Sequence, residues 1–87
     1  MITRATAYAE LAQLVAEVFM IDTSKLTPRS TANDVPGWDS VSQVMLLMRI
    51  EDTFRIELDI NRVSAAADLQ ALANLVYECR ASASGLS

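Results

Sequence analysis

Hydrophobic residues near the start of the chain recur at the spacing of an amphipathic helix. Between about residues 3 and 20, the apolar side chains fall within one arc of a helical wheel, whereas Glu10, Gln13 and Glu17 fall on the opposite side. The apolar arc contains Tyr8, Leu11, Leu14, Val15, Val18 and Phe19. The pattern therefore predicts a first helix over about 3–20 with one face packed into a core.

Residues 22–39 break this periodicity. The stretch holds both prolines of the chain, Pro28 and Pro36, together with Gly37 and a cluster of Thr, Ser, Asn and Asp. We expect a long loop without regular structure, which is uncommon in a compact domain and is often functional. Its expected apolar anchors are Leu26, Val35 and Trp38.

A second helix is predicted over 40–54, with Asp39 as its N-cap, because a carboxylate there can accept a hydrogen bond from a free N–H of the first turn. This helix has two apolar stripes. One contains Leu46, Leu47, Ile50 and Phe54, and the other contains Val41, Met45 and Met48. A helix that is apolar nearly all round is either deeply buried or offers one face to another molecule. Both faces are difficult to bury in so small a domain.

The remaining sequence predicts two further helices. The alternating segment 55–60 is read as extended loop, since an isolated strand would have no partner. A short helix is expected over about 61–66, and a longer one over about 68–80 with Asp68 as N-cap. We expect the tail 81–87 to be frayed. The prediction is an all-α, four-helix bundle with three main helices and one short third helix.

Length and composition limit the choice of function. A chain of 87 residues suits one domain, so we expect 1–87 to form a single, free-standing unit. The net charge of −4 disfavours nucleic acid and suits partners with positive patches. No leader or long apolar run is present, which favours a soluble, cytoplasmic protein that spans no membrane.

Catalytic chemistry has little support. The sequence has no histidine and one cysteine, Cys79, so it offers neither an imidazole base nor a zinc-finger ligand set. Cys79 lies on the apolar face of the last predicted helix and is expected to be a small core residue. We expect no metal site and no catalysis by this chain.

The segment Gly37-Trp38-Asp39-Ser40-Val41, between the long loop and the second helix, resembles the attachment site of acyl and peptidyl carrier proteins. That family shares Asp-Ser followed by an aliphatic residue. The run Ile50 to Phe54 is similar to the family's apolar, acidic, acidic, X, Phe pattern, and the resemblance covers about residues 4 to 80. It implies the acyl-carrier type of four-helix bundle.

The physical chemistry of Ser40 fits this resemblance. A serine that begins a helix exposes its hydroxyl, and the positive end of the helix dipole favours an attached phosphodiester by roughly 0.3–1 kcal/mol. The sequence provides no adjacent base for Ser40, which indicates a substrate of another enzyme rather than a catalytic nucleophile.

The resemblance implies a covalent 4′-phosphopantetheine on Ser40 that holds acyl, polyketide or aminoacyl groups as thioesters. A phosphopantetheinyl transferase would add the arm from coenzyme A with magnesium, and loading ligases, synthases or transferases would supply the cargo to a monomeric carrier. Asp39 would cap the helix and help the transferase to dock. The expected partner-contact residues are Val41, Met45, Met48, Glu51 and Asp52.

Alternative interpretations remain at this stage. Ser40 and Asp39 could be ordinary helix-start residues, and the second apolar stripe could be core. The chain could also be an unmodified helical interaction module that docks through Val41, Met45 and Met48.

Some positions depart from the carrier pattern. Val41 replaces the usual leucine, Met45 stands where glutamate is frequent, and Arg49 adds a positive charge. Together with Trp38, the lower acidity of the second helix favours a specialised pathway over general fatty acid synthesis. The alanine-rich third helix could leave room between the helices for an acyl chain.

Overall fold

The computed structural model describes residues 3–85, with side chains described through residue 82, and contains four α-helices. Their bounds are α1 Arg4–Phe19, α2 Ser40–Phe54, α3 Ile60–Ala65 and α4 Leu69–Gly85. No strand occurs within 3–85, and none of the helices described there is both long and apolar enough to cross a membrane. The predicted all-α fold with four helices is confirmed.

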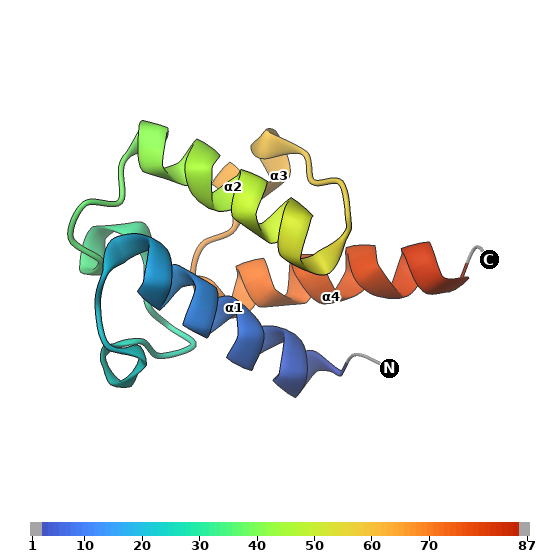
Figure 1. The fold of residues 1–87 in the computed structure, drawn as a ribbon, viewed down its shortest axis with the longest axis horizontal. Coiled ribbons are helices and arrows are strands. Elements are labelled where there is room, and N and C mark those ends of the chain that lie inside the picture. Colours follow the sequence, from blue (N-terminus) through green and yellow to red (C-terminus); the bar gives the residue numbers. More distant parts are fainter. Residues whose placement is uncertain (1–2, 86–87) are drawn as a thin grey trace.

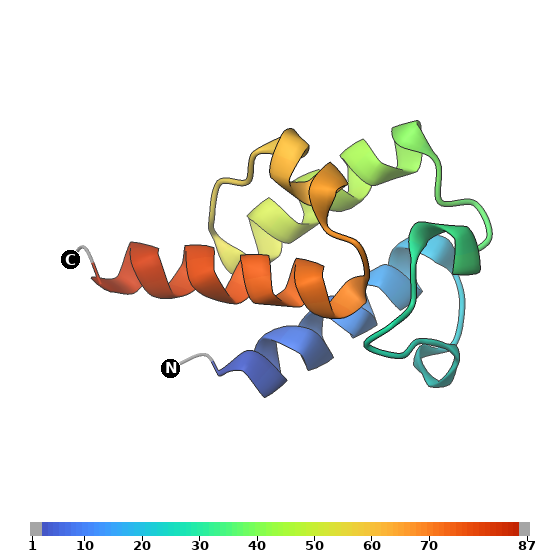
Figure 2. The same ribbon diagram turned by 180° about the vertical axis from the view of Figure 1, so that it is seen from behind.

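Helices α1 and α4 lie side by side, and both chain ends lie at the same end of the molecule (Figures 1 and 2). Helix α2 crosses them, with α3 beside it, so the start of α2 lies at the opposite end from the termini. The core is formed between these helices. Its fully buried large side chains are Leu11, Val15, Leu46, Ile50, Leu69 and Val76.

The sequence predicted a long connection without regular structure between α1 and α2. This part of the prediction is wrong, because the connection contains two 3₁₀ turns, η1 (Thr23–Lys25) and η2 (Ala32–Asp34). Each turn is closed by a local side chain. Asp22 accepts from the N–H of Ser24 at 2.9 Å, and Asp34 accepts from the N–H of Thr31 at 2.9 Å. Loops often use such short Asx-type bonds to order their backbone.

Backbone bonds hold this loop against the start of α4. The N–H of Leu69 donates to the carbonyl of Ser30 at 2.8 Å, and that of Gln70 donates to Pro28 at 2.9 Å. Asp68 accepts from the N–H of Ala71 at 2.9 Å, as expected for the predicted N-cap. The first free N–H groups of α4 are therefore satisfied by the loop and the cap.

The predicted apolar anchors of the loop are also confirmed. Leu26 and Val35 are buried, and Trp38 is partly buried against the core.

The C-terminal end differs from the sequence prediction. We expected the last helix to end near residue 80 and 81–87 to fray, but α4 continues to Gly85. The extension 81–85 contains alanines, which have the highest helix propensity, and no helix-breaking proline. Residues 86–87 of the predicted tail lie outside the described residues. Helix α3 also begins one residue earlier than expected, with Asp59 accepting from the N–H of Asn61 at 2.8 Å.

We predict that Leu46→Ala lowers the free energy of unfolding by about 2–5 kcal/mol, because the side chain is fully buried where α2 meets the core. The matched control, Met48→Ala, removes an exposed side chain from the same helix and should change stability by no more than about 0.5 kcal/mol. Urea unfolding followed by circular dichroism measures both. Equal losses would contradict the assignment of the two faces of α2.

Candidate functional site

The start of α2 is fixed by a compact turn. The Asp39 carboxylate accepts a hydrogen bond from the N–H of Ser42 at 2.8 Å, which is the expected N-cap interaction. The Ser42 hydroxyl donates to the carbonyl of Gly37 at 2.8 Å. Gly37 has φ of 86°, a conformation that glycine adopts without strain. Two side chains and one glycine thus determine where the helix begins.

Ser40 is the first residue of α2, and it is exposed. Its hydroxyl makes no hydrogen bond with any residue in the described range 3–85, in contrast to the neighbouring Ser42. Because no side chain there hydrogen-bonds Ser40, the described residues place no group to activate it as a nucleophile. The hydroxyl is accessible and unengaged at the positive end of the helix dipole, which is a favourable environment for an attached phosphate.

Hydrogen bonding stabilises the charged form of Asp39. The backbone N–H of Ser42 contributes most to lowering the pKa of this carboxyl below its usual value. Asp39 is therefore a fixed negative group next to Ser40 at neutral pH.

Aromatic packing supports the turn from the side of α1. The rings of Phe19 and Trp38 are stacked with centroids 5.1 Å apart and planes 19° from parallel. Such pairs typically contribute about 0.5–1.5 kcal/mol beyond the area that they bury. The stack joins the end of α1 to the residue that precedes Asp39, and so restrains the position of the Ser40 turn.

The second apolar stripe of α2 is exposed. Val41, Met45 and Met48 are 70%, 57% and 63% accessible, whereas Leu46, Ile50 and Phe54 of the first stripe are buried. The core interpretation of the methionine stripe is therefore wrong. Other exposed apolar residues, which the sequence reading did not single out, are Met20, Val44 and Ile60.

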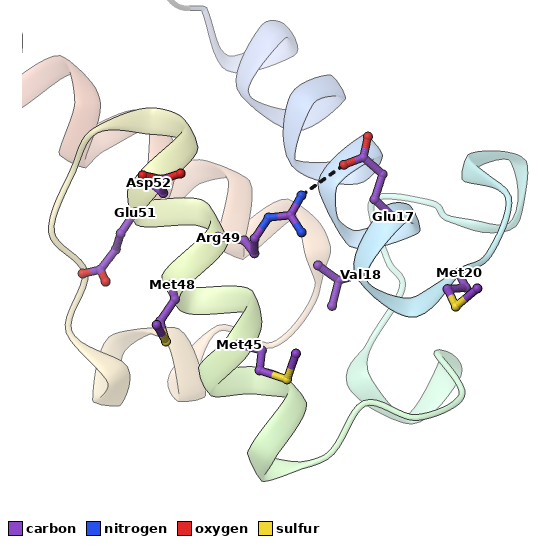
Figure 3. A pocket seen from close by; sticks show the side chains of 8 residues that line it. All are labelled: Glu17, Val18, Met20, Met45, Met48, Arg49, Glu51 and Asp52. Carbon is purple, nitrogen blue, oxygen red and sulfur yellow. Dashed lines mark hydrogen bonds and ion pairs between the residues drawn. The ribbon is translucent and has the colours of Figure 1, made fainter.

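Part of this exposed face lines a surface groove of about 880 Å³ between α1 and α2 (Figure 3). Met45 points from α2 toward Val18 of α1, and Arg49 reaches across to Glu17 at 3.3 Å. The groove is lined by Glu17, Val18, Met20, Met45, Met48, Arg49, Glu51 and Asp52. Arg49, which looked like a departure from an acidic helix, is thus paired with a carboxylate of its own chain.

The two acidic candidates differ in their surroundings. The Glu51 carboxylate accepts from the N–H of Leu58 at 2.9 Å and points toward the segment after α2. Asp52 is exposed, and its carboxylate makes no hydrogen bond within residues 3–85. Glu51 therefore helps to hold the connection between α2 and α3, whereas Asp52 presents its charge to solvent.

A family model for the phosphopantetheine attachment site matches residues 9–76, which is more than half of the chain. The chain belongs to the phosphopantetheine-binding acyl carrier protein family. As a member of this family, it is a domain for covalent attachment of phosphopantetheine, and carrier proteins of this family are generally non-catalytic. The interpretation as an unmodified interaction module loses its support.

A solved structure agrees with this assignment. The solution structure of the holo acyl carrier protein from Geobacter metallireducens is similar to this carrier with a TM-score of 0.81 and 26% identity, and the match covers 91% of each chain. A comparison with curated protein sequences gives no significant match.

The residues of this carrier fit the prosthetic group. Ser40 offers an accessible oxygen for a phosphodiester, and the start of α2 offers a positive dipole end to its negative charge. When it is attached, the group supplies a thiol that holds cargo as a thioester. Of the predicted site residues, Asp39, Ser40 and Val41 lie together at this turn, whereas Met45, Met48, Glu51 and Asp52 follow along α2.

We predict that the contribution of Asp39 to folding depends on pH. Its pKa is lowered in the folded state, so the contribution is fully present above the unfolded pKa of about 3.9 and is lost as the pH falls through the lower folded pKa. Urea unfolding between neutral and strongly acidic pH should show the stability gap between wild type and Asp39→Ala closing over that window.

Asp39→Asn is the matched control, because asparagine can cap the helix but does not titrate there. The gap between Asp39→Asn and Asp39→Ala should persist in acid. A wild-type gap that stays constant with pH would contradict the cap. The variants must be compared with the wild type at each pH, because the titration of Asp22 also changes the stability of the protein over this range. A hydrogen bond from Ser24 lowers the pKa of Asp22 as well.

Proposed function

We propose that Ser40 bears the phosphopantetheine arm and that residues 1–87 act as one carrier domain for acyl, polyketide or aminoacyl thioesters. The observation that carries the proposal is the exposed, unengaged hydroxyl of Ser40 at the capped start of α2. Ser42, two residues later, donates its hydroxyl to Gly37 and is the poorer candidate.

Attachment would occur in the active site of a phosphopantetheinyl transferase. Ser40 Oγ forms a bond to the phosphorus next to pantetheine in coenzyme A, and the bond from that phosphorus to adenosine 3′,5′-bisphosphate breaks. The hydroxyl proton passes to a base of the transferase, since the carrier has no base hydrogen-bonded to Ser40 within residues 3–85. Magnesium and coenzyme A come with the transferase, and Asp39 helps it to dock.

We predict that Ser40→Ala abolishes loading without changing the fold. The side chain is exposed and its hydroxyl makes no bond within the described residues, so the free energy of unfolding should change by no more than about 0.5 kcal/mol. The measurement is intact-protein mass spectrometry after incubation with coenzyme A, magnesium and a broad-specificity transferase. The wild type should gain one phosphopantetheine group.

Ser42→Ala is the control, because it removes the other hydroxyl of the same turn. It should still gain the group. Loading of Ser40→Ala, or loss of loading only in Ser42→Ala, would reject Ser40 as the attachment site.

We further propose that Val41, Met45 and Met48 contact the partner enzymes, with Asp52 as the charged rim. An exposed apolar stripe next to Ser40 is well placed for this, and flexible thioethers suit a surface that binds several enzymes in turn. Glu51 is a weaker candidate for direct contact because its carboxylate is bonded to Leu58. The partners expected are the transferase and cargo-loading ligases, synthases or transferases of a specialised biosynthetic pathway.

We predict that Met45→Lys lowers the kcat/KM of the transferase for this carrier by roughly tenfold, equivalent to about 1.4 kcal/mol, because it places a positive charge in the apolar contact, opposite partners expected to carry positive patches. Gln13→Lys introduces the same ammonium group on an exposed position of α1 and should leave kcat/KM unchanged. Steady-state loading assays measure both values. An equal effect of the two variants would argue against a specific docking face on α2.

A further inference from the structure

A short chain of hydrogen bonds connects three parts of the fold near Ser40. The indole N–H of Trp38 donates to Gln43 Oε1 at 3.3 Å, and Gln43 Nε2 donates to Ser64 Oγ at 2.8 Å. Trp38 belongs to the loop, Gln43 to α2 and Ser64 to α3. The Gln43 side chain therefore bridges these elements with both ends of its amide group.

This bridge lies between two cavities. An outer cavity of about 420 Å³ is lined by Ser40 and an inner cavity of about 200 Å³ reaches Leu72 of α4. The residues that both cavities share are Ala32, Trp38, Gln43 and Ser64. A group attached to Ser40 that entered the inner cavity from the outer one would have to pass this bridge.

The inner cavity has the room that the alanine-rich sequence around the predicted third helix suggested, since Ala66 and Ala67, which directly follow α3, line it. Its chemistry, however, is not that of an alkyl-binding tunnel. Besides the bridge, the polar residues in its lining are Ser30, Thr31, Asn33 and Asp68. An alkyl chain makes no hydrogen bonds, so a chain that displaced the Gln43 bridge would replace none of its bonds, and the part-buried indole N–H of Trp38 would lose its acceptor.

Helix α3 is held by few contacts. Among its six residues only Val63 is buried, and the bond from Gln43 to Ser64 is the only side-chain hydrogen bond between α2 and α3 in the described range 3–85. Elements with few buried side chains open at low free-energy cost. The Gln43 bridge is thus an important restraint on the separation of α2 and α3.

We propose that Gln43 is a specificity-determining residue that keeps long alkyl chains out of the core. While its side chain bridges Trp38 and Ser64, cargo attached through Ser40 stays in the outer cavity, and the carrier suits short or polar acyl groups. This inference rests on the proposed attachment of the arm to Ser40. It assigns to the site a class of cargo that the family assignment leaves open.

The test compares two cargoes on the full chain. A broad-specificity transferase loads ¹⁵N-labelled protein from acetyl-coenzyme A or octanoyl-coenzyme A, and mass spectrometry verifies the added group. The chemical shifts of the Trp38 indole N–H and of the Val63 and Leu72 amides are then recorded by NMR. In the wild type, the two cargoes should give the same shifts at these three groups.

Gln43→Ala should change that outcome. Without the bridge, octanoyl cargo is expected to shift the Val63 and Leu72 amides, whereas acetyl cargo is not. Gln70→Ala is the matched control, because Gln70 is also a half-buried helical glutamine whose amide bonds a neighbouring side chain, Asn74 at 3.0 Å. It should behave as the wild type does.

Three results would overturn the inference. Octanoyl-dependent shifts at Val63 and Leu72 in the loaded wild type would show that the bridge does not exclude the alkyl chain. The absence of these shifts in folded Gln43→Ala would show that Gln43 is not the barrier.

If Gln43→Ala does not fold, Ser64→Ala is the second variant. It removes one end of the bridge and must give the same octanoyl-dependent shifts. Failure to load Ser40, seen as no gain in mass, would overturn the proposed attachment and this inference together.

Discussion

The hydrogen bond from the N–H of Ser42 to the Asp39 carboxylate is the interaction on which the site depends. It determines that α2 begins at Ser40, so the serine occupies the first helical position with its hydroxyl exposed. The face that α2 buries is set by its apolar stripe, Leu46, Ile50 and Phe54, which packs into the core. The cap and this stripe together place the proposed attachment oxygen at the start of a helix whose other face is exposed.

That choice of face explains why the domain is both stable and open to partners. Leu46, Ile50 and Phe54 complete the core against α1 and α4, and no further element in the described part of the chain covers the opposite side of α2. Val41 and Met45 therefore remain exposed beside Ser40. An exposed apolar stripe is unfavourable for an isolated domain, but it is expected of one that presents cargo to other proteins.

Much of the fold follows from local sequence, whereas the finer contacts do not. The periodicity of Leu46, Ile50 and Phe54 and the capping chemistry of Asp39 act within one or two helical turns, so they were predictable. The bonds from Gln43 to Ser64 and from Arg49 to Glu17 join residues 21 and 32 positions apart, and no local pattern encodes them. The exposure of Met20, 90% accessible at the left-handed end of α1, likewise depends on how the chain leaves the helix.

The most direct test of Ser40 as the attachment site is tandem mass spectrometry of the tryptic peptide 30–49 from the loaded wild type. This peptide contains Ser30, Ser40 and Ser42, so its fragments distinguish the three serines by position. We expect the phosphopantetheine group on Ser40 alone. A group on Ser42 or on the buried Ser30 would contradict this expectation, because the exposed and unengaged hydroxyl at the start of α2 would then not determine the site of attachment.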